Sequence, residues 1–323
     1  MNALVSILIP CFNAERWVAR AIESALGQTW PNTEVIVVDD GSTDNSLKVI
    51  RSFDGQIRWE TGPNQGGNAA RNRLLQLARG DWVQYLDADD YLRSTKLERQ
   101  LAVATEYPDC DVICAPTAWE RQNNGEVLCT DETIPTPRDP WVLLAKWQLP
   151  QTGGPLWRRT ALESVGGWLV GQPCCQEHEL YLRLLASERK FGFFDECLAV
   201  YCDSEDAARV TRKIPGEVDR QRIIIFDRIE RVLAERKELT AMRLQAINDA
   251  RHQLARKYWR SDRQLKISIL DRIRRSDPSY LPDRGPASPP TYIAIYRLFG
   301  FEAAQVIAAL RRQIFAGSRQ SSV

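Results

Sequence analysis

The chain has 323 residues, 44% of them hydrophobic and 26% charged, which excludes a collagen-like or disordered protein and allows one large domain or two moderate ones. The formal net charge of +1 hides an uneven distribution: residues 213–323 carry 22 Lys and Arg against 12 Asp and Glu, whereas residues 1–212 carry 21 against 30. We therefore expect two parts with different roles, a domain at 1–212 and a basic helical extension at 213–323.

Strands and helices alternate along the first third of the chain, the pattern of a parallel sheet with crossover helices. Short apolar runs predict strands at residues 5–9, 34–38, 57–60, 82–86 and 111–115. Apolar residues at helical spacing predict helices at 15–26 and 69–78, the second ended by Gly80. Ser42 or Thr43 is expected to cap a further helix, and the capping-box pattern Thr95-Lys96-Leu97-Glu98 to open another.

The pattern changes after residue 115. Asn124-Gly125 predicts a two-residue hairpin turn, and Asp139-Pro140 predicts an N-cap followed by proline at the first helical position. A helix is predicted at 177–186, charged amphipathic helices at 216–275, a proline-rich linker at 282–290 and a last helix at 291–315.

Several classes of protein are disfavoured by features spread along the chain. No basic segment or cleavage site precedes the first apolar run, so we expect no export signal. No stretch is expected to reach the ~18 apolar residues of a membrane-spanning helix. The eight cysteines lack the C-x-x-C spacing of a zinc site and are interpreted as reduced thiols. Together these features predict a cytoplasmic protein.

Polar side chains gather just after the predicted strands. They are Asn13, Asp39, Asp40, Asp87 and Asp89. In open α/β sheets the carboxyl ends of the strands form a crevice in which ligands bind, so this edge is the predicted site. For Asp40 and Asp90 we favour a cap or turn role, because such residues commonly accept backbone hydrogen bonds there.

Asp87-Ala88-Asp89 is the strongest candidate for a metal site. An extended segment points both carboxylates the same way, and two hard oxygen donors suit Mg²⁺ or Mn²⁺, which take further ligands from water and substrate phosphates. No Gly-rich phosphate loop of a nucleoside triphosphatase or a nicotinamide dehydrogenase follows the first strand, which weakens both classes. Arg71, after Gly66-Gly67, fits a phosphate contact and a surface arginine equally well.

Four segments occur in an order and spacing that together are specific for one family. They are VSILIPCFN at 5–13, VIVVDDGSTD at 35–44, AARN at 69–72 and YLDADD at 85–90. On these segments the chain resembles the family 2 glycosyltransferases of the GT-A fold. The resemblance implies an α/β fold with a Rossmann-like, mostly parallel sheet and flanking helices, here followed by a C-terminal helical extension. It also implies metal-dependent transfer of a sugar, with inversion, from a nucleotide-diphosphate sugar to an acceptor hydroxyl.

The resemblance implies roles for individual residues on the donor side. They are Pro10, Phe12, Asn13 and Glu15 around the nucleotide base, Asp39 as hydrogen-bond acceptor for a uracil-type ring, Arg71 and Asp87 at the donor, and Asp89, then Asp87, at the metal. A uracil-type ring favours UDP or dTDP as the nucleotide.

The family's general base is usually the Asp of a Glu-Asp pair that opens a helix. Gln176 and Glu177 stand at these positions, a departure from the pattern, and we take Glu177 as the base. His178 and Glu179 are the competing candidates, and a first-turn acid favoured by the helix dipole is the structural alternative for Glu177. Among the tryptophans we expect Trp157, beside Gly153-Gly154, to stack on the acceptor.

The basic rear segment has three interpretations. We rank first solvated faces of packed helices, then contact with an anionic membrane surface, and we expect no nucleic-acid partner. The expected partners are a nucleotide-sugar donor and a glycan or lipid-linked acceptor, and the expected location is cytoplasmic or peripheral on the inner face of the membrane. Two other functions stay open: a non-catalytic nucleotide-sugar-binding or scaffold protein and, with less support, a nucleotidyltransferase.

Overall fold

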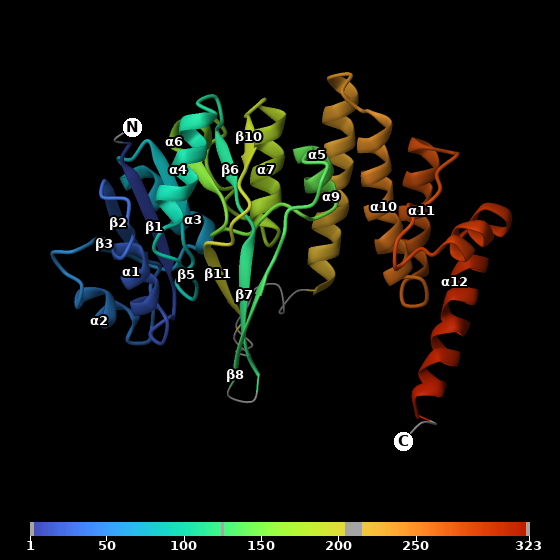
Figure 1. Ribbon diagram of the computed structural model, residues 1–323, viewed down its shortest axis with the longest axis horizontal. Coiled ribbons are helices and arrows are strands. Elements are labelled where there is room, and N and C mark those ends of the chain that lie inside the picture. Colours follow the sequence, from blue (N-terminus) through green and yellow to red (C-terminus); the bar gives the residue numbers. More distant parts are fainter. Residues whose placement is uncertain (1–2, 124–125, 204–214, 321–323) are drawn as a thin grey trace. The chain divides into compact units, whose positions relative to one another are not determined.

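The computed structural model describes residues 3–123, 126–203 and 215–320 (Figure 1). The chain divides into two compact units, residues 1–221 and 222–323, which are described separately. All eight cysteines are free thiols, seven of them buried, as expected for reduced residues.

The first unit is built on a seven-stranded sheet. In spatial order its strands are β10 (Phe191–Phe193), β6 (Val112–Cys114), β9 (Leu156–Arg158), β4 (Trp82–Tyr85), β1 (Val5–Cys11), β2 (Thr33–Asp39) and β3 (Arg58–Thr61). All neighbouring pairs are parallel except those of β9, which runs antiparallel to β4 and β6. The predicted mostly parallel α/β sheet is therefore confirmed.

Helices alternate with these strands, as the sequence predicts. They are α1 (Val18–Leu26), α2 (Ser46–Arg51), α3 (Gly67–Leu77) and α4 (Lys96–Glu106). Alternate residues of β1, including Val5, Ile7 and Ile9, share one hydrophobic core cluster with α1 and α4. Strand β1 is apolar along almost its whole length because both of its faces are buried.

Three predicted helix ends are wrong in detail. Helix α2 begins after Asn45, and neither Ser42 nor Thr43 caps it. Helix α4 begins after Thr95 as predicted, but the Thr95 side chain makes no capping hydrogen bond. Helix α3 ends at Ala78 in an extended conformation rather than at Gly80. Gly80 instead packs against β1, where an added Cβ would lie 2.6 Å from the Ser6 nitrogen.

A second, four-stranded sheet lies in the same unit, in the order β5 (Tyr91–Leu92), β11 (Ala199–Asp203), β7 (Thr117–Asn123) and β8 (Glu126–Asp131). Strands β7 and β8 form the predicted antiparallel pair, while their predicted turn residues Asn124-Gly125 lie outside the described residues.

Among the described residues the first unit also contains the helices α5 (Pro140–Ala145), α6 (Arg159–Ser164) and α7 (Gln176–Ala186). The predicted cap at Asp139 is confirmed, because its carboxylate accepts hydrogen bonds from the backbone N–H groups of Trp141 and Val142 at 2.9 and 3.1 Å.

The second unit is helical, as predicted from the charged amphipathic pattern. Its helices are α9 (Pro215–Glu235), which begins in the first unit, α10 (Ala241–Lys257), α11 (Arg263–Ser276) and α12 (Pro290–Gln320). The prediction that no segment could span a membrane is wrong by length and composition for 22 residues of α12, Pro290–Arg311, of which only 17% is buried. Helical geometry is interrupted inside α12 at Gly300, whose φ is 77° and ψ −174°.

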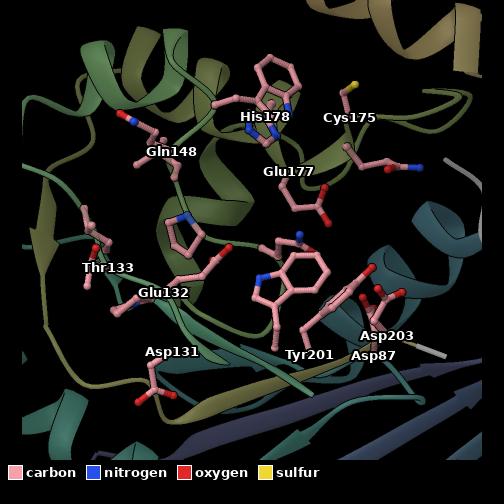
Figure 2. A pocket seen from close by; sticks show the side chains of 18 of the residues that line it. Asp87, Asp131, Glu132, Thr133, Gln148, Cys175, Glu177, His178, Tyr201 and Asp203 are labelled. Atoms are coloured by element: carbon pink, nitrogen blue, oxygen red, sulfur yellow. The ribbon is translucent and has the colours of Figure 1, made fainter. Parts of the chain in front are cut away.

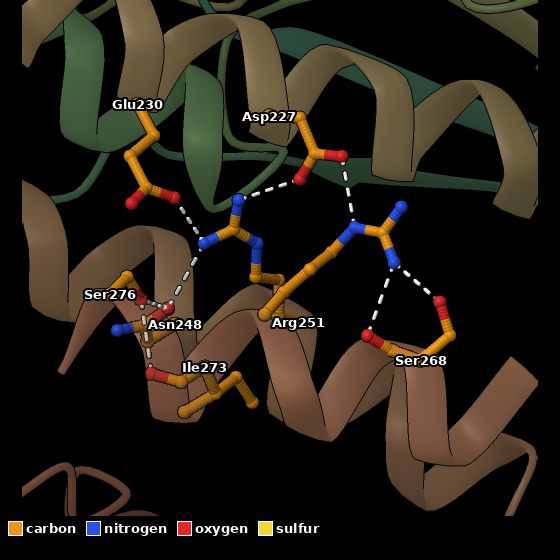
Figure 3. Close-up of polar contacts among 8 residues, drawn as sticks. Asp227, Glu230, Asn248, Arg251, Ser268, Ile273 and Ser276 are labelled. Carbon is orange, nitrogen blue, oxygen red and sulfur yellow. Dashed lines mark hydrogen bonds and ion pairs between the residues drawn. The ribbon is translucent and has the colours of Figure 1, made fainter. Parts of the chain in front are cut away.

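Arg251 is the buried centre of the polar contacts that join α9, α10 and α11 (Figure 3). Its guanidinium donates to Asp227 at 2.7 Å and to Glu230, while Arg272 of α11 donates to the other Asp227 oxygen at 2.9 Å. Asp227 of α9 thus accepts from Arg251 of α10 and from Arg272 of α11, so these ion pairs connect the three helices.

Replacing Arg251 with Met is expected to destabilise the second unit by about 2–4 kcal/mol, since it removes one partner of a largely buried ion-pair network. Denaturant unfolding of the full chain measures this loss, and Arg274→Met, on an exposed pair with Asp271, is the matched control expected to cost less than about 1 kcal/mol. Equal stability of the two variants would contradict the role assigned to Arg251.

Candidate functional site

The loop after β1 is fastened to the loop after β2. Asn13, in a left-handed conformation with φ 50°, donates its backbone N–H to the Ser42 hydroxyl at 2.9 Å and accepts from the Thr43 N–H at 2.8 Å. The Glu15 carboxylate accepts from the Asn45 N–H at 2.7 Å. Asn13 and Glu15 thus shape the loop, and the side chain of Phe12, directly before Asn13, is 49% exposed.

Asp39 and Asp40 end β2 and have different partners. Asp39 is buried and accepts from the Thr61 hydroxyl at 2.6 Å and from the Ser42 N–H at 3.3 Å. Asp40 accepts from the N–H groups of Gln65 and Gly66 at 2.8 and 2.9 Å and so fixes the turn that enters α3. The turn role predicted for Asp40 is confirmed.

Arg71 of α3 and Asp87, just after β4, form an ion pair of 2.7 Å that is mostly buried. The guanidinium carbon of Arg71 also lies 4.8 Å from the ring centre of Trp168, which is fully buried beneath it. Burial by itself lowers the pKa of Arg71, but the charges of Asp87 and Glu177 outweigh it and raise the pKa above its ordinary value. Arg71 therefore stays charged and is not a simple surface arginine.

The two carboxylates that follow Asp87 in the sequence, those of Asp89 and Asp90, differ in exposure and in the role that each one has. Asp89 is partly exposed and faces the same cavity as Asp87. Asp90 is buried and accepts the Cys202 N–H at 2.9 Å, which holds β11 next to the end of β4. Asp90 has the structural role that was predicted for it.

A cavity of about 1040 Å³ opens at this edge of the sheet (Figure 2). Its walls come from segments far apart in the sequence: Arg71, Asp87 and Asp89, residues 131–135, residues 147–151, and 175–178 at the start of α7. In Figure 2 the Glu177 carboxylate lies between Asp87 on one side and Glu132 on the other. The cavity is large enough for a nucleotide sugar or for one sugar of a donor together with an acceptor.

Glu177 lines the cavity, and its Oε1 accepts a hydrogen bond from the Thr152 hydroxyl at 2.5 Å. Glu179, a competitor for the role of base, is buried, pairs with Arg183 at 2.8 Å and does not line the cavity. His178 does line it, with its ring stacked on Trp147 at a centroid distance of 3.6 Å. Glu177 and His178 are thus the two candidates that the structure retains.

The prediction for Trp157 requires a correction. Trp157 lies in β9, between two other strands of the central sheet, and has 0% exposure with its ring stacked on Tyr181. A side chain with no open face cannot stack on an acceptor, and we remove it from the site.

The aromatic residues that do line the cavity are Trp119, Trp147 and Tyr201. The sequence indicates none of these three and favours Trp157. The rings of Trp119 and Tyr201 lie 4.4 Å apart because β7 and β11 pair in parallel, a long-range contact.

The predicted site residues fall into two groups. Arg71, Asp87, Asp89 and Glu177 line the cavity. Pro10, Phe12, Asn13, Glu15 and Asp39 do not line it but follow or end β1 and β2. Since β4, β1 and β2 are adjacent parallel strands, both groups lie along the same edge of the sheet.

Comparison with known proteins agrees with this geometry. Residues 6–164 match the family model described as glycosyl transferase family 2. This part of the chain belongs to that family. The resemblance noted in the sequence is therefore confirmed, and the matched segment contains β1, β2, β4 and the aspartates that follow them.

Curated relatives match only part of the chain. The glycosyltransferase YibD of Escherichia coli is 34% identical over 166 residues, 50% of this chain and 44% of the relative, and a glycosyltransferase of Haemophilus influenzae is 43% identical over 102 residues, 30% and 41%. Chondroitin synthase of Pasteurella multocida is 41% identical over 136 residues, 41% of this chain and 14% of the relative. The chain thus spans less than half of each relative.

Solved structures share the fold. TarS of S. aureus, in a complex with UDP-GlcNAc, aligns with a TM-score of 0.57 at 18% identity and covers 85% of this chain and 91% of the TarS chain. The mannosyltransferase PcManGT of Pyrobaculum calidifontis, in a complex with GDP-Man and Mn²⁺, aligns with a TM-score of 0.50 at 16% identity, covering 97% and 87%. Both likenesses show the GT-A fold that the sequence predicted.

A divalent cation fits the residues at this site. Asp87 and Asp89 offer hard carboxylate oxygens at one wall of an open cavity. The described part of the chain contains no cluster of three or more His, Cys, Asp or Glu that could hold a metal, so water and donor phosphates would complete the coordination.

Proposed function

We propose that this glycosyltransferase moves a sugar from a nucleotide-diphosphate sugar, with UDP or dTDP favoured, to a hydroxyl of a glycan or lipid-linked acceptor. The observation that carries the proposal is one cavity lined by Arg71, Asp87, Asp89 and Glu177. It brings the residues that we propose for the diphosphate and the metal together with the candidate base. The UDP-GlcNAc and GDP-Man complexes of the two structural neighbours support a nucleotide-sugar donor.

On the donor side, the nucleotide base would lie against exposed Phe12, with buried Asp39 beside it to accept a ring N–H. Asn13 and Glu15 hold the shape of this loop, and Pro10 precedes it at the end of β1. Arg71 would approach the diphosphate, because its charge is retained and its position is fixed by Asp87 and Trp168.

Asp89 first, and Asp87 second, would hold Mg²⁺ or Mn²⁺. When bound, the cation neutralises negative charge that develops on the leaving diphosphate. Asp87 is already paired with Arg71, which is why we assign the direct contact to Asp89.

On the acceptor side, Glu177 would accept the proton of the attacking hydroxyl through Oε2, since Thr152 donates to Oε1. The acceptor oxygen forms a bond to the anomeric carbon while the bond from that carbon to the diphosphate oxygen breaks. Attack from the face opposite the diphosphate inverts the anomeric centre. Trp147, Trp119 and Tyr201 replace Trp157 as candidates for the acceptor platform.

The reaction is tested by measuring release of nucleoside diphosphate from UDP-, dTDP- and GDP-sugars, with Mn²⁺ or with EDTA, in the presence of an acceptor mixture. We expect release from one donor class that EDTA abolishes. No release from any donor, together with binding of one, would favour the non-catalytic alternative, which the Gln176-Glu177 departure keeps open. Release of pyrophosphate from a nucleoside triphosphate would favour a nucleotidyltransferase.

We also propose a cytoplasmic protein with peripheral membrane contact. The support is the basic second unit and the apolar helix Pro290–Arg311 within it.

A further inference from the structure

Two large apolar side chains of the second unit are mostly exposed. Leu298 and Phe299, just before the break at Gly300, are 73% and 72% exposed, more than any other large hydrophobic residue of the described chain. After the break, the adjacent residues Val306 and Ile307 are also exposed, and exposed Leu310 lies one helical turn further along the same face. The opposite face of this part of α12 is packed against protein, because Phe301, Ala304 and Gln305 are buried.

A separate cavity of about 450 Å³ lies at the same break. It is lined by Arg274, Arg297, Ser279, Tyr280, Tyr296 and Gly300, among others. Two arginines and three residues that carry hydroxyl groups therefore line one cavity. The exposed residues Leu298 and Phe299 directly follow Arg297 in the sequence. Arg274 is exposed and contacts Asp271 at 3.1 Å, and Asp277 is an acidic residue of the cavity wall. Among the described residues Arg297 has no ion-pair partner within 4.0 Å.

The charge of the whole unit favours an anionic partner. Residues 222–323 contain 20 Lys and Arg against 10 Asp and Glu. Such an excess attracts the unit to a negatively charged surface, while the exposed apolar residues require a partner that is itself apolar. An anionic lipid bilayer offers both.

The backbone conformation of α12 favours a helix that lies on the membrane over one that crosses it. Gly300 divides Pro290–Arg311 into two pieces of about ten residues, each roughly 15 Å long, about half the ~30 Å of a hydrocarbon core. The break also interrupts the hydrogen bonding that a spanning helix needs throughout. Shallow insertion at the interface fits this geometry.

We propose that the second unit docks on membranes rich in anionic phospholipid, inserting Leu298 and Phe299 and receiving a phosphate headgroup between Arg274 and Arg297. This inference goes beyond the proposed transfer reaction and does not depend on it, because neither the donor nor Glu177 takes part in docking.

The test is flotation of the full chain with vesicles of phosphatidylglycerol and phosphatidylcholine, and with phosphatidylcholine alone. We expect flotation with the anionic vesicles that weakens with salt, a loss of roughly tenfold or more in Leu298→Asp/Phe299→Asp, and about fivefold in Arg297→Gln. Met242→Asp, at an exposed apolar residue in the first turn of α10, is the matched control and should float like the wild type.

Equal flotation of wild type and the Leu298/Phe299 double variant, or no flotation of the wild type, would overturn the proposal. Size-exclusion chromatography with light scattering tests a second copy of this chain as the occupant: a wild-type dimer that the double variant converts to monomer would also overturn it. Inorganic phosphate competing as strongly as anionic vesicles for a protein labelled near Arg297 would assign the cavity to a soluble anion instead.

Discussion

Glu177→Gln is expected to lower the turnover of sugar transfer by about 10²- to 10⁴-fold, because it removes the only acid of the α7 N-terminus that lines the cavity within the described structure. The substitution is nearly isosteric and can still accept the hydrogen bond from Thr152. Binding of the donor should therefore change little. Steady-state kinetics with separate measurement of donor affinity distinguishes the two effects.

His178→Gln provides the matched comparison for Glu177, since both residues line the cavity from the same turn of α7. We expect a smaller effect, because the His178 ring is stacked flat on Trp147 and acts mainly in packing. A variant at His178 that loses turnover while Glu177→Gln keeps it would transfer the role of base to His178. Loss in neither variant would remove the base from this helix.

Asp89→Asn is expected to lower metal-dependent transfer by at least about 100-fold, because stabilisation of the leaving diphosphate by the cation is worth several kcal/mol. Its second effect is on the cation itself: the Mn²⁺ concentration needed for half-maximal turnover should rise. Turnover measured across a Mn²⁺ titration records both changes.

Asp131→Asn is the control for Asp89, since Asp131 lines the same cavity but contacts Arg93 at 3.6 Å on an exposed surface. Its Mn²⁺ dependence should match that of the wild type. Asp87→Asn should weaken both metal dependence and folding stability, because it leaves buried Arg71 without its ion-pair partner. A normal Mn²⁺ titration in Asp89→Asn would refute its assignment as the metal ligand.

The positions of the residues proposed for the donor side could be predicted from the sequence, because each lies in a short local segment of the chain. Each strand of the parallel sheet ends at the same edge, so the positions of Asp39, Asp87 and Asp89 follow from the ends of apolar runs. The turn roles of Asp40 and Asp90 follow from the same reasoning. Burial of Arg71 could not be predicted, since it depends on Trp168, almost a hundred residues away.

The acceptor half depends on contacts between distant segments. Trp157 lies near a glycine pair that resembles a loop, yet the following residues form a short strand inserted antiparallel into the central sheet. Trp119 and Tyr201 approach each other only through the pairing of β7 with β11. A tryptophan in a predicted strand has two possible faces, and the sequence does not say which of them meets a cavity.

The thermal stability of the full chain with nucleotide sugars, with and without Mn²⁺, tests the central claim most directly. A ligand that binds only the folded state at a hundred times its Kd adds about 2.7 kcal/mol, which corresponds to a rise of roughly 5 °C or more in Tm. We predict such a rise for one nucleotide-sugar class, dependent on Mn²⁺ and lost in Asp89→Asn. The absence of a metal-dependent rise with every UDP-, dTDP- and GDP-sugar would contradict the account.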